Sequence, residues 1–204
     1  QDRARTHLML GPWDHGVPSA TDGRTADLDF GPNAAFDYDG WVLDFHDHYM
    51  RGVANRFSQD APVRYFVMGT NEWRDAGRWP PPARRVETLY FDSMTGSGVR
   101  KLTASIPATA GSRSAFVADP RSPVVDPHDS PGPHDYRALA SRQDLLTFDT
   151  EPLPAPLTVA GEITALIHVS CDCRDFDLWV RLQDVHPDGR AINLMSPGND
   201  ALRA

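Results

Sequence analysis

The segment Gly11-Pro12-Trp13-Asp14-His15-Gly16 holds the side chain best suited to proton transfer in this chain. It follows an apolar run, residues 6–10, that predicts a short buried strand. In an α/β sheet, the loops that leave the carboxyl ends of the strands form the binding crevice. A histidine there, in a turn fixed by glycine and proline, can act as a general base because imidazole titrates near neutral pH. By spacing alone the signal is weak, because a loop histidine is more often exposed to solvent and has no catalytic role.

Two other groups of side chains invite a metal interpretation, and neither has ligand spacing. His46 and His48 lie at i and i+2 of a predicted helix, where side chains diverge by about 200°. Zinc ligands on one helix favour i and i+4. Cys171 and Cys173 are followed by no second Cys/His pair at ligand spacing. We therefore predict no metal ligand and no organic cofactor. A bond between cysteines two residues apart would be cramped, so reduced thiols are predicted, which favours a cytosolic compartment.

A sheet and one helix must position the His15 loop. A polar loop rich in glycine and proline is predicted to run on to about residue 33. A helix is then predicted over residues 35–51, with Gly52 as its C-terminal cap, and a strand over residues 63–68. The predicted helix carries one apolar face at spacings of three and four: Tyr38, Trp41, Val42, Phe45 and Tyr49.

The second part of the chain has the pattern of a β protein. The sequence Pro80-Pro81-Pro82 predicts a semi-rigid spacer, so we place a first domain at residues 1–79 and a second at residues 80–204. Many short strands separated by turns favour a β-sandwich for the second domain. The candidate strands are residues 86–91, 99–104, 114–118, 144–148, 155–160, 162–170, 176–185 and 190–194.

Two of these candidate strands alternate regularly between apolar and polar positions, which is typical of half-buried antiparallel strands. They are residues 162–170 and 176–185. The turn sequence His186-Pro187-Asp188-Gly189 follows and predicts a hairpin with residues 190–194. The stretch from Asp119 to Ser141 has little periodicity and is predicted to be a long loop, a kind of segment that often carries function.

The loop sequence Gly11-Pro12-Trp13-Asp14-His15-Gly16 resembles the catalytic-histidine loop of the cocaine-esterase family of α/β hydrolases. That family includes the α-amino-acid ester hydrolases and is related to the X-prolyl dipeptidyl aminopeptidases. Further segments resemble family motifs in the same order along nearly the whole chain: residues 63–74, 79–80, 119–124, 135–137, 142–146, 151–153, 159–161, 175–176 and 184–191.

This resemblance implies a mainly β fold: the C-terminal end of an α/β-hydrolase domain followed by a jelly-roll β-sandwich, truncated at its C-terminus. It also implies that the sequence is the C-terminal part of a longer serine hydrolase that cleaves an ester or amide through a Ser-His-Asp triad. His15 would take the proton from the serine and pass it to the leaving group. Trp13 would line the acyl pocket, or else pack beneath the loop.

The sequence departs from the family pattern where the nucleophile would be. It contains no Gly-x-Ser-x-Gly elbow, and the order of such triads is Ser, Asp, His, so serine and aspartate are expected before Gln1. Asp14 adjoins His15 and is not expected to be the triad acid. The fragment alone is therefore expected to be inactive. The family's pocket loop would correspond to residues 126–134, which are shorter than usual in the family and lack bulky apolar side chains, so no residue there is assigned to substrate.

Composition excludes several other classes of protein. With 20 basic and 28 acidic residues the net charge is −8, which disfavours a nucleic-acid backbone as partner. No apolar run reaches the roughly 18–20 residues that span a bilayer, so no membrane partner is expected. The expected partner is a small-molecule ester or amide, and a homo-oligomer is compatible with the sequence. The alternative function is a non-catalytic β-sandwich that binds a ligand or carbohydrate, for which Trp179 is the outward aromatic residue.

Overall fold

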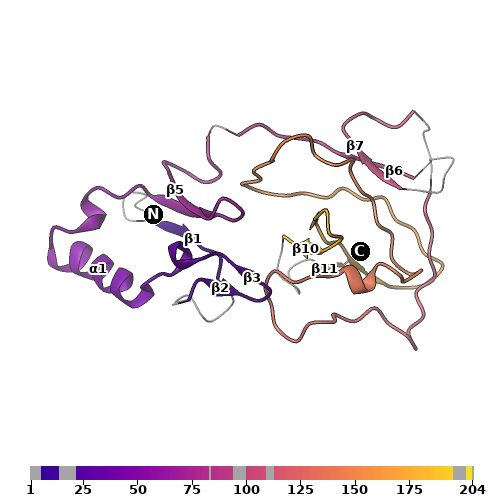
Figure 1. Cartoon of the computed structure of the whole chain (residues 1–204), viewed down its shortest axis with the longest axis horizontal. Coiled ribbons are helices and arrows are strands. Elements are labelled where there is room, and N and C mark those ends of the chain that lie inside the picture. The colour runs from indigo at the N-terminus through magenta and orange to yellow at the C-terminus, as the bar shows by residue number, and fades with distance from the viewer. Residues whose placement is uncertain are drawn as a thin grey trace. The chain divides into compact units, whose positions relative to one another are not determined.

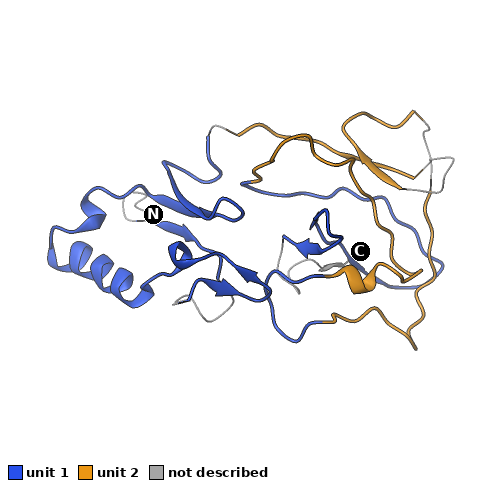
Figure 2. Ribbon diagram, viewed as in Figure 1, with its two compact units in different colours: residues 1–82, 128–135, 160–204 blue, residues 83–127, 136–159 orange. Residues whose placement is uncertain are grey.

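The structure is a computed structural model that describes residues 6–13, 22–82, 84–93, 100–108, 113–194 and 201–203. The described part of the chain is built from short strands and irregular segments, with one α-helix (Figure 1). It divides into two compact units (Figure 2). The first contains residues 1–82, 128–135 and 160–204, and the second contains residues 83–127 and 136–159. No helix in the described part is long and apolar enough to cross a membrane.

A three-stranded sheet forms the centre of the first unit. Its strand order is β1 (Leu8–Leu10), β4 (Val63–Val67) and β5 (Glu72–Ala76). β1 runs parallel to β4, and β5 returns antiparallel to β4. The predicted strands at residues 6–10 and 63–68 are thus confirmed. Phe66 of β4 packs with Phe30 and Ala34 in a small buried core, because β4 is the central strand and has partners on both edges.

The helix α1 (Tyr38–Arg51) confirms the predicted helix and starts three residues later than expected. The reason is its cap: Oδ1 of Asp37 accepts a hydrogen bond from the N–H of Gly40 at 2.9 Å. Gly52 ends the helix with a φ of 72°, a left-handed conformation that glycine adopts without steric cost. The predicted apolar face contacts Phe57 of the turn η3 (Arg56–Ser58) through three rings: those of Trp41, Phe45 and Tyr49.

A hairpin of two short strands lies within the region that was predicted to be a loop. β2 (Arg24–Thr25) pairs with β3 (Leu28–Asp29), and the turn η2 (Pro32–Ala34) follows. The tight turn between the strands consists of Ala26 and Asp27, and Ala26 has a φ of 49°. Because the turn lacks the Asn-Gly or Asp-Gly sequence of common two-residue hairpins, its sequence carried no hairpin signal.

The remaining strands of the first unit form two pairs. β8 (Asp177–Trp179) pairs with β11 (Ala201–Arg203), and β9 (Gln183–Val185) pairs with β10 (Ala191–Asn193). The β9–β10 hairpin was predicted from its turn and is confirmed. In that turn the N–H of His186 donates to the carbonyl of Arg190 at 2.8 Å.

The second unit contains one strand pair, β6 (Tyr90–Asp92) with β7 (Lys101–Thr103), and the turn η4 (Arg137–Leu139). β6 confirms the end of the candidate at residues 86–91, and β7 confirms the middle of the candidate at residues 99–104. Phe91 of β6 packs edge-on against Phe148, with ring centroids 4.9 Å apart.

Several predicted strands are wrong in the described part of the chain. Residues 114–118, 144–148, 155–160 and 162–170 form no strand, and the candidate at 176–185 is interrupted between β8 and β9. An alternating pattern predicts which face of a strand is apolar, but a strand also needs a hydrogen-bonded neighbour in register. Residues 162–170 have no such neighbour among the described residues.

The predicted state of the cysteines is also wrong, because a disulfide joins Cys171 and Cys173.

Candidate functional site

The carboxyl ends of two parallel strands define the candidate active-site edge of the sheet. β1 and β4 pair in parallel, with Leu8 opposite Val63 and Leu10 opposite Tyr65. The loops that follow the two strands therefore leave the sheet at the same end. The start of the loop after β1 is held by a hydrogen bond, in which the hydroxyl of the buried Thr25 donates to the carbonyl of Pro12. This contact fixes the path of the chain up to the segment that carries His15. His15 and the neighbouring Asp14 lie outside the described residues.

Trp13 is the predicted site residue that the structure places. Its ring stacks on Phe36 with centroids 4.9 Å apart and tilts against Trp73 at 5.7 Å. Its indole N–H donates to the carbonyl of Ala34 at 3.4 Å. The ring also lies against Gly11, where a Cβ atom would come within 2.4 Å of it, so only glycine fits there. The ring is therefore held by these contacts, and the residue remains half-buried.

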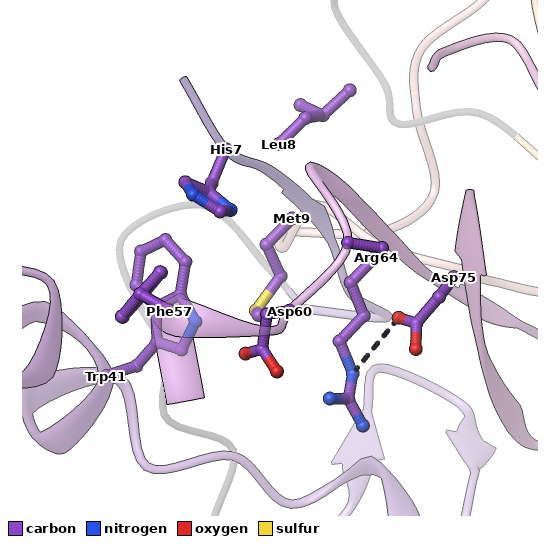
Figure 3. A pocket seen from close by; sticks show the side chains of 9 residues that line it. His7, Leu8, Met9, Trp41, Phe57, Asp60, Arg64 and Asp75 are labelled. Carbon is purple, nitrogen blue, oxygen red and sulfur yellow. Dashed lines mark ion pairs between the residues drawn. The ribbon is translucent and has the colours of Figure 1, made fainter. Parts of the chain in front are cut away.

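A small pocket lies between β1, the start of α1 and the turn η3 (Figure 3). His7, Met9, Trp41, Phe57 and Arg64 are among the residues that line it. Nε2 of His7 lies 2.8 Å from the hydroxyl of Tyr49, so this histidine has a structural partner. The cavity measures about 10 Å³, which is room for about one water molecule. It is too small to receive an ester or amide substrate.

A separate cluster of side chains that could hold a metal ion consists of Asp27, His128 and His134. Nδ1 of His134 lies 3.2 Å from Oδ2 of Asp27, and the rings of His128 and His134 stack in parallel with centroids 4.1 Å apart. One potential ligand atom from each of the three side chains lies within 4.8 Å of the other two. Asp27 is one of the two turn residues between β2 and β3, and it follows by two residues the Thr25 that anchors the loop after β1.

This cluster was not predicted. The two histidines belong to the stretch of residues 126–134 to which no role was assigned, and Asp27 is distant in the sequence. The local signal was weak: the two histidines are six residues apart and enclose the sequence Ser130-Pro131-Gly132-Pro133, which favours a turn over a helix or a strand. Only the docking of this loop on the β2–β3 hairpin brings the three residues together.

The histidines that were considered as ligands on α1 have separate partners. Nδ1 of His46 lies 3.3 Å from the sulfur of Met50, and Nδ1 of His48 lies 3.0 Å from the carbonyl of Val53. Neither residue belongs to a group of three potential ligands in the described part of the chain.

The resolved pKa shifts belong to ion pairs of the second unit. A hydrogen bond from Arg142 lowers the pKa of Asp144, with Nη2 and Oδ2 2.6 Å apart. Arg121 lowers the pKa of Asp119 in the same way. A hydrogen bond from Lys101 lowers the pKa of Glu151, which in turn raises the pKa of Lys101. Each of these shifts is caused by the partner in an ion pair, so we assign these charged residues a structural role.

Comparison with family models places most of the chain in one domain type. Residues 55–201 match the model described as X-Pro dipeptidyl-peptidase C-terminal non-catalytic domain. The matched range begins after α1, so the His15 loop precedes it.

Known proteins resemble nearly the whole chain. Cocaine esterase of Rhodococcus sp. (strain MB1 Bresler) is 35% identical over 208 residues, which cover 95% of this chain and 36% of that protein. A protein of Mycobacterium bovis, provisionally named a serine esterase, is 32% identical over 193 residues, or 91% of this chain and 29% of that protein. The chain therefore spans about a third of the length of the curated relatives that it matches.

A solved structure has the same fold. It is the crystal structure of an aminopeptidase from a marine sediment archaeon, Thaumarchaeota archaeon, with a TM-score of 0.65 and 26% identity. The match covers 97% of this chain and 34% of the aminopeptidase chain. The predicted fold class is confirmed: mainly β, with the end of an α/β-hydrolase domain followed by a β-sandwich.

Proposed function

The chain belongs to the X-Pro dipeptidyl-peptidase C-terminal domain family, and from this membership and its esterase relatives we propose that it forms the C-terminal part of a serine hydrolase. The observation that carries the proposal is the 35% identity to a cocaine esterase over 95% of the chain. The substrate would be a small-molecule ester or amide. The reaction would pass through an acyl-enzyme, in which a serine ester forms as the alcohol or amine leaves and water then releases the acid.

In this proposal His15 is the general base and acid of the triad. It would accept the proton of the serine hydroxyl as the oxygen attacks the substrate carbonyl, and would then return that proton to the leaving group. The serine, the aspartate and the oxyanion-hole donors would come from a part of the protein that precedes Gln1. The support within the described residues is positional, because the loop leaves the carboxyl end of β1 and Thr25 holds Pro12 three residues before His15.

We propose that Trp13 borders the acyl pocket. Its ring is held by Phe36 and Trp73 and remains half-buried, two residues before His15. A rigid aromatic ring in this place offers apolar contact to an acyl group without losing conformational freedom on binding.

The test of the triad assignment is the His15→Ala variant of the full-length protein, assayed with a chromogenic ester such as 4-nitrophenyl acetate. Loss of a triad histidine lowers kcat on the order of 10⁴- to 10⁶-fold. His46→Ala is the matched control, since His46 is exposed on α1, and it should keep the activity of the wild type. Turnover of His15→Ala at the wild-type rate would reject the role of His15.

A second candidate function is a binding module without catalysis, which the description of residues 55–201 as a non-catalytic domain favours. Trp179, the proposed contact for a carbohydrate, is 53% exposed, but the guanidinium of Arg181 lies over its ring at 5.8 Å from the centroid. A full-length protein that binds an oligosaccharide and hydrolyses no ester would favour this candidate over the hydrolase.

A further inference from the structure

The loop of residues 128–135 is docked closely on the β2–β3 hairpin. The N–H of Asp27 donates to the carbonyl of Pro133 at 3.2 Å, and Oδ2 of Asp27 accepts a hydrogen bond from the N–H of Asp135 at 3.1 Å. Gly132 has a φ of 124°, and a Cβ atom there would lie 2.8 Å from the Cβ of Ala26. These hydrogen bonds and the close approach at Gly132 fix how the loop packs on the hairpin. The packing places both histidines near the carboxylate of Asp27.

The ring of His134 is buried and its tautomer follows from its neighbours. Its side chain is 6% exposed, and Nε2 lies 2.9 Å from the carbonyl oxygen of Ser130. A carbonyl oxygen only accepts hydrogen bonds, so Nε2 carries a hydrogen, and in the neutral ring Nδ1 carries a lone pair. Nδ1 is buried and makes no hydrogen bond within the described part of the chain.

Oδ2 of Asp27 lies 3.2 Å from this buried nitrogen. Two electron-rich atoms at this distance repel one another unless a proton or a cation lies between them. The pair lacks hydrogen-bond geometry, which argues against a shared proton. A metal ion does not need hydrogen-bond geometry between Nδ1 and Oδ2, because an ion bound to both atoms lies to one side of the line that joins them.

The distances and donor types agree with zinc. Two ligand atoms of a tetrahedral zinc ion, each about 2.0–2.1 Å from the metal, lie about 3.3–3.4 Å apart, close to the 3.2 Å between Nδ1 and Oδ2. His128 is the third donor, and its Nε2 lies 3.1 Å from the carbonyl of Asp135. Each imidazole thus directs one nitrogen at a backbone carbonyl, an arrangement that orients zinc-binding histidines in other proteins.

We propose that Asp27, His128 and His134 bind a zinc ion that joins the loop of residues 128–135 to the β2–β3 hairpin. Two imidazoles and one carboxylate make a three-ligand zinc set, and water completes the tetrahedron. The in-plane lone pairs of stacked rings lie in parallel planes, here with ring centroids 4.1 Å apart, so the ring of His128 has to tilt from its stack on His134 for both lone pairs to point at one ion. The proposal concerns binding and stability and does not depend on the hydrolase assignment.

The first test is zinc binding by the untagged full-length protein after its metal has been removed with a chelator. Zn²⁺ is titrated in competition with a chromogenic indicator. Asp27→Asn is the informative variant, because Asp27 lies at the surface and asparagine keeps its shape. We expect Asp27→Asn and His128→Gln each to lower the zinc affinity by more than about tenfold. Equal affinity of the wild type and Asp27→Asn overturns the proposal.

The matched control is His186→Gln. Nε2 of His186 lies 3.5 Å from Oδ2 of Asp184, which makes a histidine–carboxylate pair that belongs to no group of three potential ligands among the described residues. This variant should retain the affinity of the wild type for zinc. A loss equal to that of Asp27→Asn would show that the binding is not specific to the cluster and would also overturn the proposal.

The second test separates a zinc ion from a protonated His134. Thermal unfolding is measured for the wild type and Asp27→Asn, each with Zn²⁺ and with EDTA. We expect Zn²⁺ to raise the Tm of the wild type and to leave that of Asp27→Asn unchanged. If the wild type exceeds Asp27→Asn by the same margin in both solutions, the pair is an imidazolium–carboxylate ion pair and the proposal fails.

Discussion

Oδ2 of Asp27 accepts a hydrogen bond from the backbone N–H of Asp135, so one side chain in a hairpin turn holds the end of a loop from a distant part of the sequence. The side chain of Asp135 is held as well, because its Oδ1 accepts a hydrogen bond from the N–H of Ala191 in β10. Within the first unit, Asp27 and Asp135 thus link the β2–β3 hairpin, the loop and the β9–β10 hairpin.

This close docking predicts that Gly132→Ala destabilises the protein. The variant would have to hold alanine at a φ of 124° and place its Cβ atom 2.8 Å from that of Ala26. Strain of this kind costs about 1–3 kcal/mol. Urea unfolding measures the loss, and Gly77→Ala is the control because a Cβ atom at Gly77 meets nothing within 4 Å. A Gly132→Ala variant as stable as Gly77→Ala would contradict the docking.

Phe57 should be one of the larger contributors to the stability of the first unit. It is 6% exposed, and its ring contacts those of His7, Trp41 and Phe45. Replacing a buried phenylalanine with alanine costs about 3–5 kcal/mol because it leaves a cavity. Leu43→Ala on α1, where the side chain is 66% exposed, should change the free energy of unfolding little. Chemical denaturation of both variants compares the two sites, and similar losses would argue against the packing of α1 on Phe57.

The ion pair between Arg142 and Asp144 predicts a pH-dependent contribution to stability. Arg142 lowers the pKa of Asp144 in the folded protein, so this contribution is complete above the unfolded value of about 3.9. It is lost as the pH falls through the lower folded pKa. Asp144→Asn should therefore be less stable than the wild type at pH 7, and the difference should shrink on acidification below about pH 4.

Urea unfolding at a series of pH values measures this difference. Asp172→Asn serves as the control, since Asp172 is exposed and forms no ion pair among the described residues. A difference between the wild type and Asp144→Asn that stays constant down to pH 3 would show that Arg142 does not stabilise the charged carboxylate.

Trp13 is tested by separating its effects on KM and kcat in the full-length protein. If its ring borders the acyl pocket, Trp13→Ala should raise KM for an apolar acyl ester about tenfold to a hundredfold, because a large apolar contact is lost. Trp13→Phe should retain most of the affinity, since phenylalanine can also stack on Phe36. A fall in kcat at unchanged KM would instead assign the ring to positioning the His15 loop alone.

Local features of the structure could be predicted because the residues that determine them are neighbours in the sequence. The helix α1 follows from an apolar face of period 3.6 and a terminal glycine, and the hairpin of β9 and β10 follows from its turn. The strand β4 could be recognised because it is a short run of β-branched and aromatic residues that only Arg64 interrupts. The segment of residues 162–170 has an equally clear pattern and forms no strand, since the pattern contains no information about a partner.

The amino-acid sequence by itself determined the fold class, the position of α1 and the resemblance that makes His15 the candidate base. Only the tertiary structure decided that Trp13 packs on Phe36 and Trp73, and that Asp27 meets His128 and His134. The physical reason is the range of the interactions. Periodicity, capping and turn chemistry act over a few residues, whereas a ligand cluster forms when loop docking closes a long segment of chain. The spacing of residues in the sequence does not predict how the loop docks. The buried Nδ1 of His134 could therefore be recognised only in the folded structure.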